Sequence, residues 1–379
     1  MSEIVRGRAF ASLFSNWPLI AVAVVISLLG VVTMHPFVAG GESLAPRQLL
    51  WIAISTAVYF ICSFVDMRFL RRTPVIISLY FGVLALLIVL LLVVSPVQGA
   101  KSWFSLGPFS FQPSDPAKIV IIALIAKYFS RRHTEIGQFW HVIVSGAYTG
   151  AVMLVVLVQP DLGTAAIMGI VWFGMILVSG ISKKHLAIVF ATGLIAAGSL
   201  WTFALHDYQK ARIMTFINPA ADIHGSGYNA YQAMVAVGSG EVTGKGIGYG
   251  TQSKLRFLPE YETDFIFASF AEEWGFMGIV LLLSLYSLLL FYLVSLARRA
   301  ATNFDALFTI GVAILLLAHL GIHAGINMGL LPVTGTTIPF MSYGGSHLLV
   351  EFAALGIVAS LARDARSVPR EFAGQEYEG

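Results

Sequence analysis

The segment VLALLIVLLLVV, residues 83–94, is an uninterrupted apolar run, and IVLLLSLYSLLLFYLV, residues 279–294, is nearly as apolar. A helix needs roughly 20 mostly apolar residues to cross about 30 Å of hydrocarbon, and both runs lie within longer apolar stretches. Of the 379 residues, 57% are hydrophobic and 11% are charged, with a mean hydropathy of +0.82. Soluble domains carry about 25% charged residues, and disordered chains carry more charge with little hydrophobicity. The composition therefore excludes both classes and predicts an all-α polytopic membrane protein.

The apolar segments predict about ten transmembrane helices within one integral membrane domain that spans residues 1–379. They lie at about 17–34, 47–65, 75–95, 116–130, 139–159, 164–180, 185–205, 264–296, 307–328 and 347–362. One connection is long, at about 206–263 between the seventh and eighth helices. Loops that long within a compact protein are usually functional, so we expect this one to contribute to the site.

The basic residues predict the orientation, because cytoplasmic loops of membrane proteins carry an excess of Lys and Arg. One side has 15 of them: Arg6, Arg8, Arg68, Arg71, Arg72, Lys127, Arg131, Arg132, Lys183, Lys184, Arg298, Arg299, Arg363, Arg366 and Arg370. The other side has 7: Arg47, Lys101, Lys210, Arg212, Lys245, Lys254 and Arg256. We therefore expect both termini in the cytoplasm and the long loop on the outer face. No small-residue cleavage site follows the first apolar segment, so we expect it to be retained as a span.

Several chemistries are excluded by what the chain lacks. Its single cysteine, Cys62, excludes an internal disulfide framework and a Cys-cluster zinc site. A net charge of +3 is too small to indicate nucleic acid as a partner. The stretch GSGEVTGKGIGYG, residues 238–250, fails the Walker pattern because Lys245 is followed by Gly246. We expect its glycines to let the backbone turn sharply or approach a lipid head group.

Charges at membrane depth cost about 2.5–3.5 kcal/mol each on insertion scales, so they are candidates for function. In QPSDPAK, residues 112–118, Asp115 before Pro116 predicts a helix start with Asp115 as N-cap. Lys118 follows three residues later, on the same face as Asp115. One interpretation is a capped helix with an internal ion pair. The other adds that Lys118 faces a cavity that holds an anionic ligand.

Two further aspartates stand at predicted helix junctions. Asp161, in QPDLGT at 159–164, either caps the sixth span or belongs to the site. Asp264 and Glu272 are predicted on one helix face about 12 Å apart along the axis, too far for a carboxylate pair that acts on one atom. Asp264 is the residue best placed at the membrane boundary to act as a base, and the alternative is that it caps the eighth span together with Thr263.

The last connection, GLLPVTGTTIPFMSYGGSH at 329–347, is free of Asp, Glu, Lys and Arg and rich in Gly, Pro, Thr and Ser. Irregular backbone at membrane depth is tolerated only where it is buried in protein or lines a cavity. As a bare pattern, this stretch is typical of a re-entrant loop.

Together these motifs make the chain resemble the SEDS family of bacterial cell-wall glycosyltransferases, most closely its elongation members, over essentially its whole length. The resemblance rests on KSWFSLGPFSFQPSDPAK (101–118), QPDLGTA (159–165), RIMTFINP (212–219), GYNAYQA (227–233), TQSKLRFLPE (251–260), TDFIFASFAEE (263–273) and HAGINMGLLPVTGTTIPFMSYGGS (323–346). Two positions depart from the family pattern. Asp115 stands where Glu is usual, and His347 stands where a second serine is usual.

The resemblance implies an enzyme of the bacterial cytoplasmic membrane that polymerises lipid II, the undecaprenyl-pyrophosphate-linked disaccharide, on the outer face. It also implies a class B penicillin-binding protein as transpeptidase partner, together with other membrane proteins of the elongation complex. Asp264 matches the essential acidic position of the family and is the expected catalytic residue. The expected substrate-binding residues are Lys118, Asp115, Asp161, Arg212, Gln252, Trp103 and Ser342. A divalent cation, Mg²⁺ or Mn²⁺, is compatible with this chemistry, and its ligands are not indicated.

Three alternatives stay open at the level of sequence. Broken helices and buried charges are also typical of a lipid II flippase or another transporter, although the charges gather near the outer face. A scaffold for wall synthases would account for the size of the chain but not for Asp264. The septal polymerase of the same family is the third.

Overall fold

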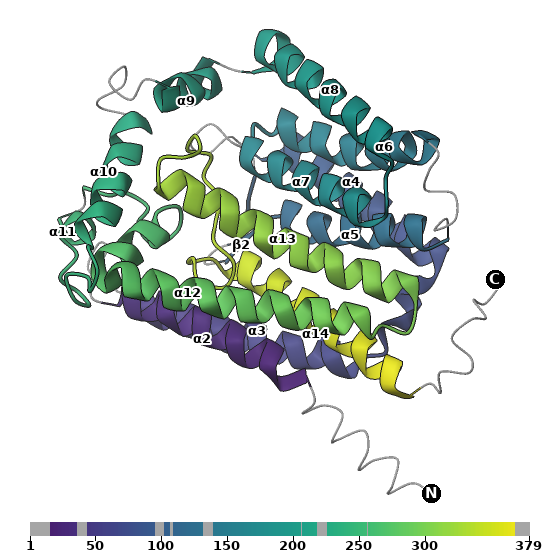
Figure 1. Cartoon of the computed structure of the whole chain (residues 1–379), viewed down its shortest axis with the longest axis horizontal. Helices are drawn as coiled ribbons and strands as arrows, with labels where there is room; N and C mark the ends of the chain where they lie inside the picture. Colours follow the sequence, from purple (N-terminus) through teal and green to yellow (C-terminus); the bar gives the residue numbers. More distant parts are fainter. Residues whose placement is uncertain are drawn as a thin grey trace, which may run out of the picture.

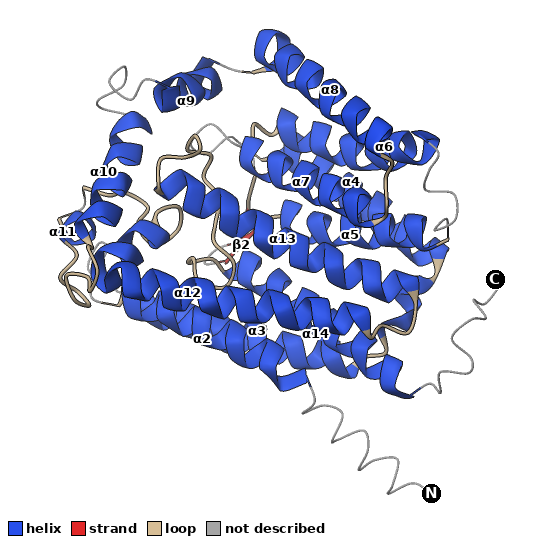
Figure 2. Cartoon of the chain, in the orientation of Figure 1, coloured by secondary structure: helices blue, strands red, loops and turns tan. Residues whose placement is uncertain are grey.

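The computed structural model describes residues 16–35, 44–94, 102–106, 109–131, 139–205, 207–217, 226–255 and 257–367, and these are helical apart from one short hairpin and the connecting turns (Figures 1 and 2). The helices are α2 (Trp17–Met34), α3 (Ala45–Phe64), η2 (Met67–Arg71), α4 (Thr73–Val93), α5 (Ser114–Ser130), α6 (Phe139–Val158), α7 (Leu162–Val178), α8 (Lys183–Ser199), η3 (Leu200–Ala204), α9 (Asp207–Ile217), α10 (Ser226–Ser239), α11 (Thr251–Lys254), α12 (Ile266–Arg298), α13 (Asn303–Asn327) and α14 (Gly345–Ser367). The hairpin pairs β1 (Phe104–Leu106) with β2 (Phe109–Phe111) in antiparallel register.

Each of the ten predicted segments is helical, and the predicted all-α membrane fold is confirmed. By length and hydropathy, eight helices of the described ranges can cross a membrane: α2, α3, α4, α6, α8, α12, α13 and α14. The other two segments, α5 and α7, have 17 residues each. The count of ten spans therefore stays a prediction.

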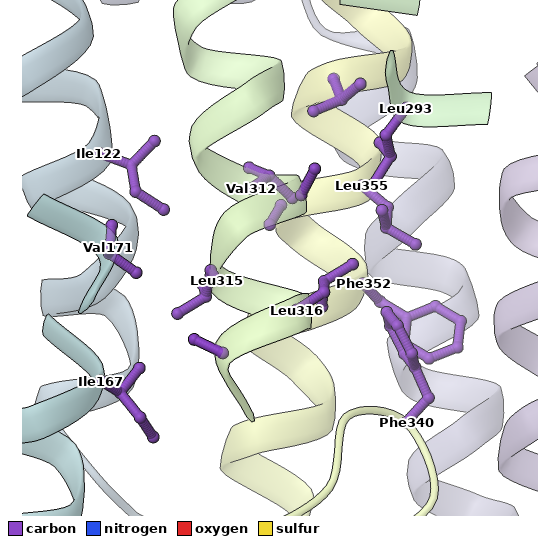
Figure 3. Close-up of a cluster of buried hydrophobic side chains, with 14 of the residues drawn as sticks. Ile122, Ile167, Val171, Leu293, Val312, Leu315, Leu316, Phe340, Phe352 and Leu355 are labelled. Atoms are coloured by element: carbon purple, nitrogen blue, oxygen red, sulfur yellow. The ribbon is translucent and has the colours of Figure 1, made fainter. Parts of the chain in front are cut away.

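Helix α13 forms the centre of the bundle, packed against α5, α7, α12 and α14. Figure 3 shows side chains of α13 between those of α5 and α7 on one side and those of α14 on the other. Among the labelled residues, these are Val312, Leu315 and Leu316 of α13, Ile122 of α5, Ile167 and Val171 of α7, and Phe352 and Leu355 of α14. Helix α8 lies at the edge of the bundle and has no buried residue (Figure 1). In a bilayer an apolar outer face is solvated by lipid, so the bundle needs to bury only its inner residues.

The long loop is not structureless, since it contains α9, α10 and α11 at one end of the bundle (Figure 1). The start of α2 and the end of α14 lie at the opposite end (Figure 1). This arrangement agrees with the predicted orientation, in which both termini face the side away from the long loop.

Helix α12 is broken at Gly275, where φ is 64° and ψ is −164°. Backbone of the glycine-rich stretch fills the break. The Phe276 N–H donates to the Glu241 carbonyl at 2.9 Å, and the Lys245 N–H donates to the Glu272 carbonyl at 2.9 Å. The eighth span, predicted at about 264–296, therefore contains a break, which is stable because the freed peptide groups find partners in another segment.

The predicted common helix face of Asp264 and Glu272 was wrong. The α12 helix begins at Ile266 with Phe265 at the N-cap position, so Asp264 precedes the helix and does not cap it. The Glu272 carboxylate instead accepts from Lys245 Nζ at 2.7 Å and from the Thr251 N–H at 3.0 Å, where α11 begins.

We expect Gly275→Ala to destabilise the fold. A Cβ there would lie 2.2 Å from the Gly244 nitrogen, and the backbone conformation itself is costly, at about 1–3 kcal/mol, for a residue other than glycine. Thermal unfolding in detergent should show a lower Tm. As a matched control, Gly82→Ala on α4 places its Cβ in open space and should leave Tm unchanged or slightly higher. Equal Tm values for the two variants would contradict the packing described.

The orientation can be tested by cysteine labelling, because Cys62 is the single native cysteine. In a Cys62→Ser background, Lys254→Cys on α11 should react with a membrane-impermeant maleimide in intact cells. Lys184→Cys at the start of α8 should react only after permeabilisation. Both positions are exposed, so a reversed pattern would mean a reversed orientation.

Candidate active site

The second half of the connection between α13 and α14, residues 336–342, is largely buried, whereas Met328, Leu330 and Leu331 in its first half are exposed. Side chains bind the backbone groups of the buried half. His323 Nδ1 lies 2.7 Å from the Thr336 carbonyl, and His319 Nδ1 lies 3.1 Å from the Thr337 carbonyl. The Phe340 N–H donates to Glu351 at 2.7 Å. Because both flanking helices hold it, this loop has a fixed path through the bundle.

The same loop fixes the backbone that leads into α12. Ser342 Oγ donates to the Thr263 carbonyl at 2.8 Å, a contact between positions 79 residues apart in the sequence. The Tyr343 N–H donates to the Glu262 carbonyl at 2.8 Å. These two contacts hold the two residues directly before Asp264.

Asn327, at the end of α13, holds Asp264 from the other side. Its Nδ2 donates to the Asp264 carbonyl at 3.0 Å, and its Oδ1 accepts from the Ala268 N–H at 3.1 Å. Asn327 thus satisfies an N-terminal peptide group of α12 that its own N-cap residue leaves unbound. The sequence analysis did not predict this role for Asn327, which lies within the motif at 323–346. A buried Asn at the end of an apolar helix could have indicated it.

The Asp264 side chain is half-buried and faces the loop at Gly335, whose φ is 65°. A Cβ on Gly335 would lie 3.3 Å from Asp264 Oδ2. Burial and then the negative charge of Glu260 raise the pKa of Asp264 to about 7, against an opposing effect of Arg212. A carboxyl with a pKa near the working pH is suited to general base catalysis.

Asp161 caps α7, which confirms one of its two interpretations. Its carboxylate accepts from the Thr164 N–H at 3.0 Å and from Gln112 Nε2 at 3.3 Å. Burial raises the pKa of Asp161, and its charge acts on Asp264. Asp161 is therefore an electrostatic neighbour of the expected base as well as a cap.

Asp115 and Lys118 form the predicted ion pair, with 2.9 Å between Asp115 Oδ1 and Lys118 Nζ, and both side chains are buried. The N-cap prediction for Asp115 was wrong. Helix α5 begins at Ser114, so Asp115 lies in its first turn and its carboxylate turns to Lys118. Lys118 Nζ also lies 3.2 Å from His319 Nε2. His319 was not predicted, although its place four residues before His323 puts both on one helix face.

The remaining predicted residues are more dispersed. Arg212 on α9 acts on Asp264 through its charge. Ser342 is buried, with its hydroxyl bound to Thr263 and to the Ile338 N–H at 3.0 Å. Gln252 lies on α11, where its N–H donates to Glu272, and Trp103 is 38% exposed before β1. Within the described part of the chain, no hydrogen bond or ion pair joins Gln252 or Trp103 to Asp264.

Comparisons with known proteins show the family and the fold of the chain. The sequence model of one family, described as cell cycle protein and carrying the names FtsW, RodA and SpoVE, matches residues 8–367. The peptidoglycan glycosyltransferase MrdB of Escherichia coli K12 is 39% identical over 273 residues, which are 70% of this chain and 71% of MrdB.

Two solved structures have the same fold. One comes from work on the structural coordination of polymerization and crosslinking by a peptidoglycan synthase complex; it is 32% identical with a TM-score of 0.78, over 92% of this chain and 98% of that one. The rod shape determining protein RodA of Thermus thermophilus is 30% identical with a TM-score of 0.68, over 92% of this chain and 96% of RodA. From this match along nearly its whole length, the chain belongs to the SEDS family of FtsW, RodA and SpoVE, and within it is similar to RodA.

Proposed function

We propose that this chain polymerises lipid II into glycan strands on the outer face of the bacterial cytoplasmic membrane during cell elongation. It is a RodA-like peptidoglycan glycosyltransferase by its family and its relatives. The observation that carries the proposal is Asp264, a half-buried carboxylate with a pKa of about 7 whose backbone is held by the loop after α13 and by Asn327.

In the proposed reaction, a sugar hydroxyl of one molecule attacks the anomeric carbon that carries the diphosphate in the other. A carbon–oxygen bond forms between the sugars, the bond to the diphosphate breaks, and the hydroxyl proton passes to Asp264. The diphosphate leaves with its lipid, so the base needs no acid partner. One base suits a single inverting displacement better than the carboxylate pair of a glycosidase.

Positive charge near Asp264 supports the departure of the diphosphate. Arg212 is the cation whose charge acts directly on Asp264, and the charge of Lys118 acts on Asp161. Charge placed where an anion develops stabilises the transition state. We assign Arg212 to the diphosphate because its charge acts at Asp264. Lys118 binds Asp115 and His319.

A divalent cation, Mg²⁺ or Mn²⁺, fits this site only when it is shared with the substrate. Within the described ranges, no group of three His, Cys, Asp or Glu residues is placed to hold a metal ion. Mg²⁺ is commonly bound by one or two carboxylates together with substrate phosphates. Asp264 would be the protein ligand, and the ion would neutralise charge on the diphosphate.

The partner we propose is a class B penicillin-binding protein that crosslinks the new strands. One structural neighbour comes from a complex that coordinates polymerization with crosslinking, and this chain covers 98% of it. Further membrane proteins of the elongation complex would assemble around the same bundle.

Purified protein incubated with labelled lipid II tests the function. Glycan ladders on a gel are the expected product, with a larger yield when a candidate transpeptidase is added. Translocation of lipid II across a vesicle membrane without ladders would instead identify a flippase. If the protein shows neither activity, alone or with the partner, the remaining alternative is a scaffold for wall synthases.

We expect Asp264→Asn to fold and to lose polymerisation, because Asn has nearly the same volume but cannot accept the proton. Loss of a general base typically costs about 10²–10⁴-fold in rate. Asp264→Glu should also be severely impaired, since displacement by about 1 Å can cost about 10²-fold. Glycan formation per folded enzyme is the measurement. A folded Asn variant with a near wild-type rate would refute the role of Asp264.

The pH profile gives an independent check on the same residue. Because a base acts only when deprotonated, and Asp264 has a pKa of about 7, the rate should rise with pH and level off above about 7. Glu260 is exposed and its negative charge raises that pKa. Glu260→Gln should therefore move the rising limb to lower pH. A shift of the rising limb to higher pH, or no shift, would show that Asp264 does not determine the pH profile.

A further inference from the structure

A buried cluster of charged side chains surrounds the first turn of α14. His347 Nε2 lies 2.8 Å from Glu351 Oε1, one turn further along the helix, and His347 Nδ1 lies 3.5 Å from Asp115 Oδ1 on α5. Lys118 binds the same Asp115 oxygen at 2.9 Å and faces His319 of α13 at 3.2 Å. All five residues are at most 6% exposed.

With both carboxylates ionised, the charges of this cluster balance in one way. Asp115 and Glu351 are two anions, and Lys118 is one cation. The ring of His319 is neutral, because its Nδ1–H donates to the Thr337 carbonyl while its Nε2 accepts from Lys118. An uncompensated charge in a buried site is strongly unfavourable. The cluster is therefore neutral when His347 is an imidazolium between the two carboxylates.

Glu351 connects this cluster to the loop after α13. Its Oε2 accepts the Phe340 N–H at 2.7 Å. Phe340 has a φ of 62° and packs its fully buried ring against Phe352, with 5.5 Å between the ring centroids. Two residues further on, Ser342 binds the Thr263 carbonyl. An ionised Glu351 thus holds the turn that places the backbone directly before Asp264.

We propose that His347 is a positioning residue for the base: its positive charge compensates the Glu351 carboxylate and keeps it bound to the Phe340 N–H, and thereby holds Asp264 in place. The proposal rests on the proposed polymerase function. His347 touches Asp115 and Glu351 and not the reacting atoms. Without its charge, Glu351 is left as an uncompensated buried carboxylate, so it turns away from the cluster, leaves the Phe340 N–H, and lets the turn move.

The test is the rate of glycan formation by His347→Gln, measured per folded enzyme in detergent. We expect kcat to fall about 10- to 10²-fold, the effect of a misplaced catalytic group, with KM for lipid II changed less than about twofold because the substrate contacts remain. A merely structural role would lower Tm and the amount of folded protein and leave kcat per folded enzyme unchanged.

Substitutions of Glu351 separate charge balance from simple contact. Glu351→Gln removes the second anion, so a neutral His347 suffices, and the amide oxygen still accepts the Phe340 N–H; kcat should stay near wild type. In that background His347→Gln should have little further effect. Glu351→Leu removes the acceptor and should lower kcat whichever residue stands at 347.

His141→Gln is the matched control, since His141 is a buried histidine on α6 bound to Tyr128 at 2.9 Å, outside the cluster. It should leave kcat unchanged. If His347→Gln lowers kcat equally in the wild-type and Glu351→Gln backgrounds, or not at all, the proposal is overturned. If His347→Gln alone fails to fold, recovery of active protein by adding Glu351→Gln supports it, and failure of the double variant overturns it.

Wild-type activity separates this proposal from the one on which it rests. A wild-type protein that forms no glycan refutes the polymerase function and the positioning role with it. A wild-type protein that polymerises, beside an equally active His347→Gln variant, refutes the positioning role alone.

Discussion

Peptide groups in the interior of a membrane protein must find partners within the protein, because hydrocarbon offers none. The connection between α13 and α14 meets this constraint with side chains in place of a helix. His319 and His323 bind two of its carbonyls, and Glu351 binds its Phe340 N–H. Tyr286 of α12 donates to a further carbonyl, that of Pro339. Polar residues on three helices are thus explained by a single requirement, and in meeting it they fix the loop that positions Asp264.

The break in α12 meets the same requirement by another route. Here the freed backbone groups bind other backbone groups, those of the glycine-rich stretch. The two backbone segments approach so closely that both need a glycine at the contact, and these glycines are Gly275 and Gly244. Just before the break, the Glu273 carbonyl accepts from the Gly246 N–H at 3.0 Å. At the other end of this segment, Asn327 binds the Ala268 N–H. The first part of α12 is therefore fixed at both of its ends.

The ionisable groups divide into two sets with opposite requirements. Burial and then the like charges around Asp264, of which Glu260 has the largest effect, raise its pKa to about 7 against the opposing charge of Arg212, and so keep its carboxylate basic. Asp115 and Lys118 are buried against each other and against the histidines of α13 and α14. A reactive group needs an environment that perturbs it, whereas a group that holds structure needs a balanced one. The fold holds both sets of groups in one bundle. The reactive carboxylate of Asp264 lies just before α12, and the paired charges of Asp115 and Lys118 lie in the interior.

Features that depend on near neighbours along the chain could be predicted from the amino-acid sequence. Apolar runs decide which segments are helices in a membrane, and the spacing of Asp115 and Lys118 decides that they pair. The cap formed by Asp161 is local for the same reason. The motifs also identified Asp264, through resemblance. Two features came from the folded structure alone. Asp264 precedes its helix, and its neighbour Thr263 is held through its carbonyl by Ser342, 79 residues away in the sequence. Such contacts depend on how helices pack against each other, and no periodicity along the chain encodes that packing.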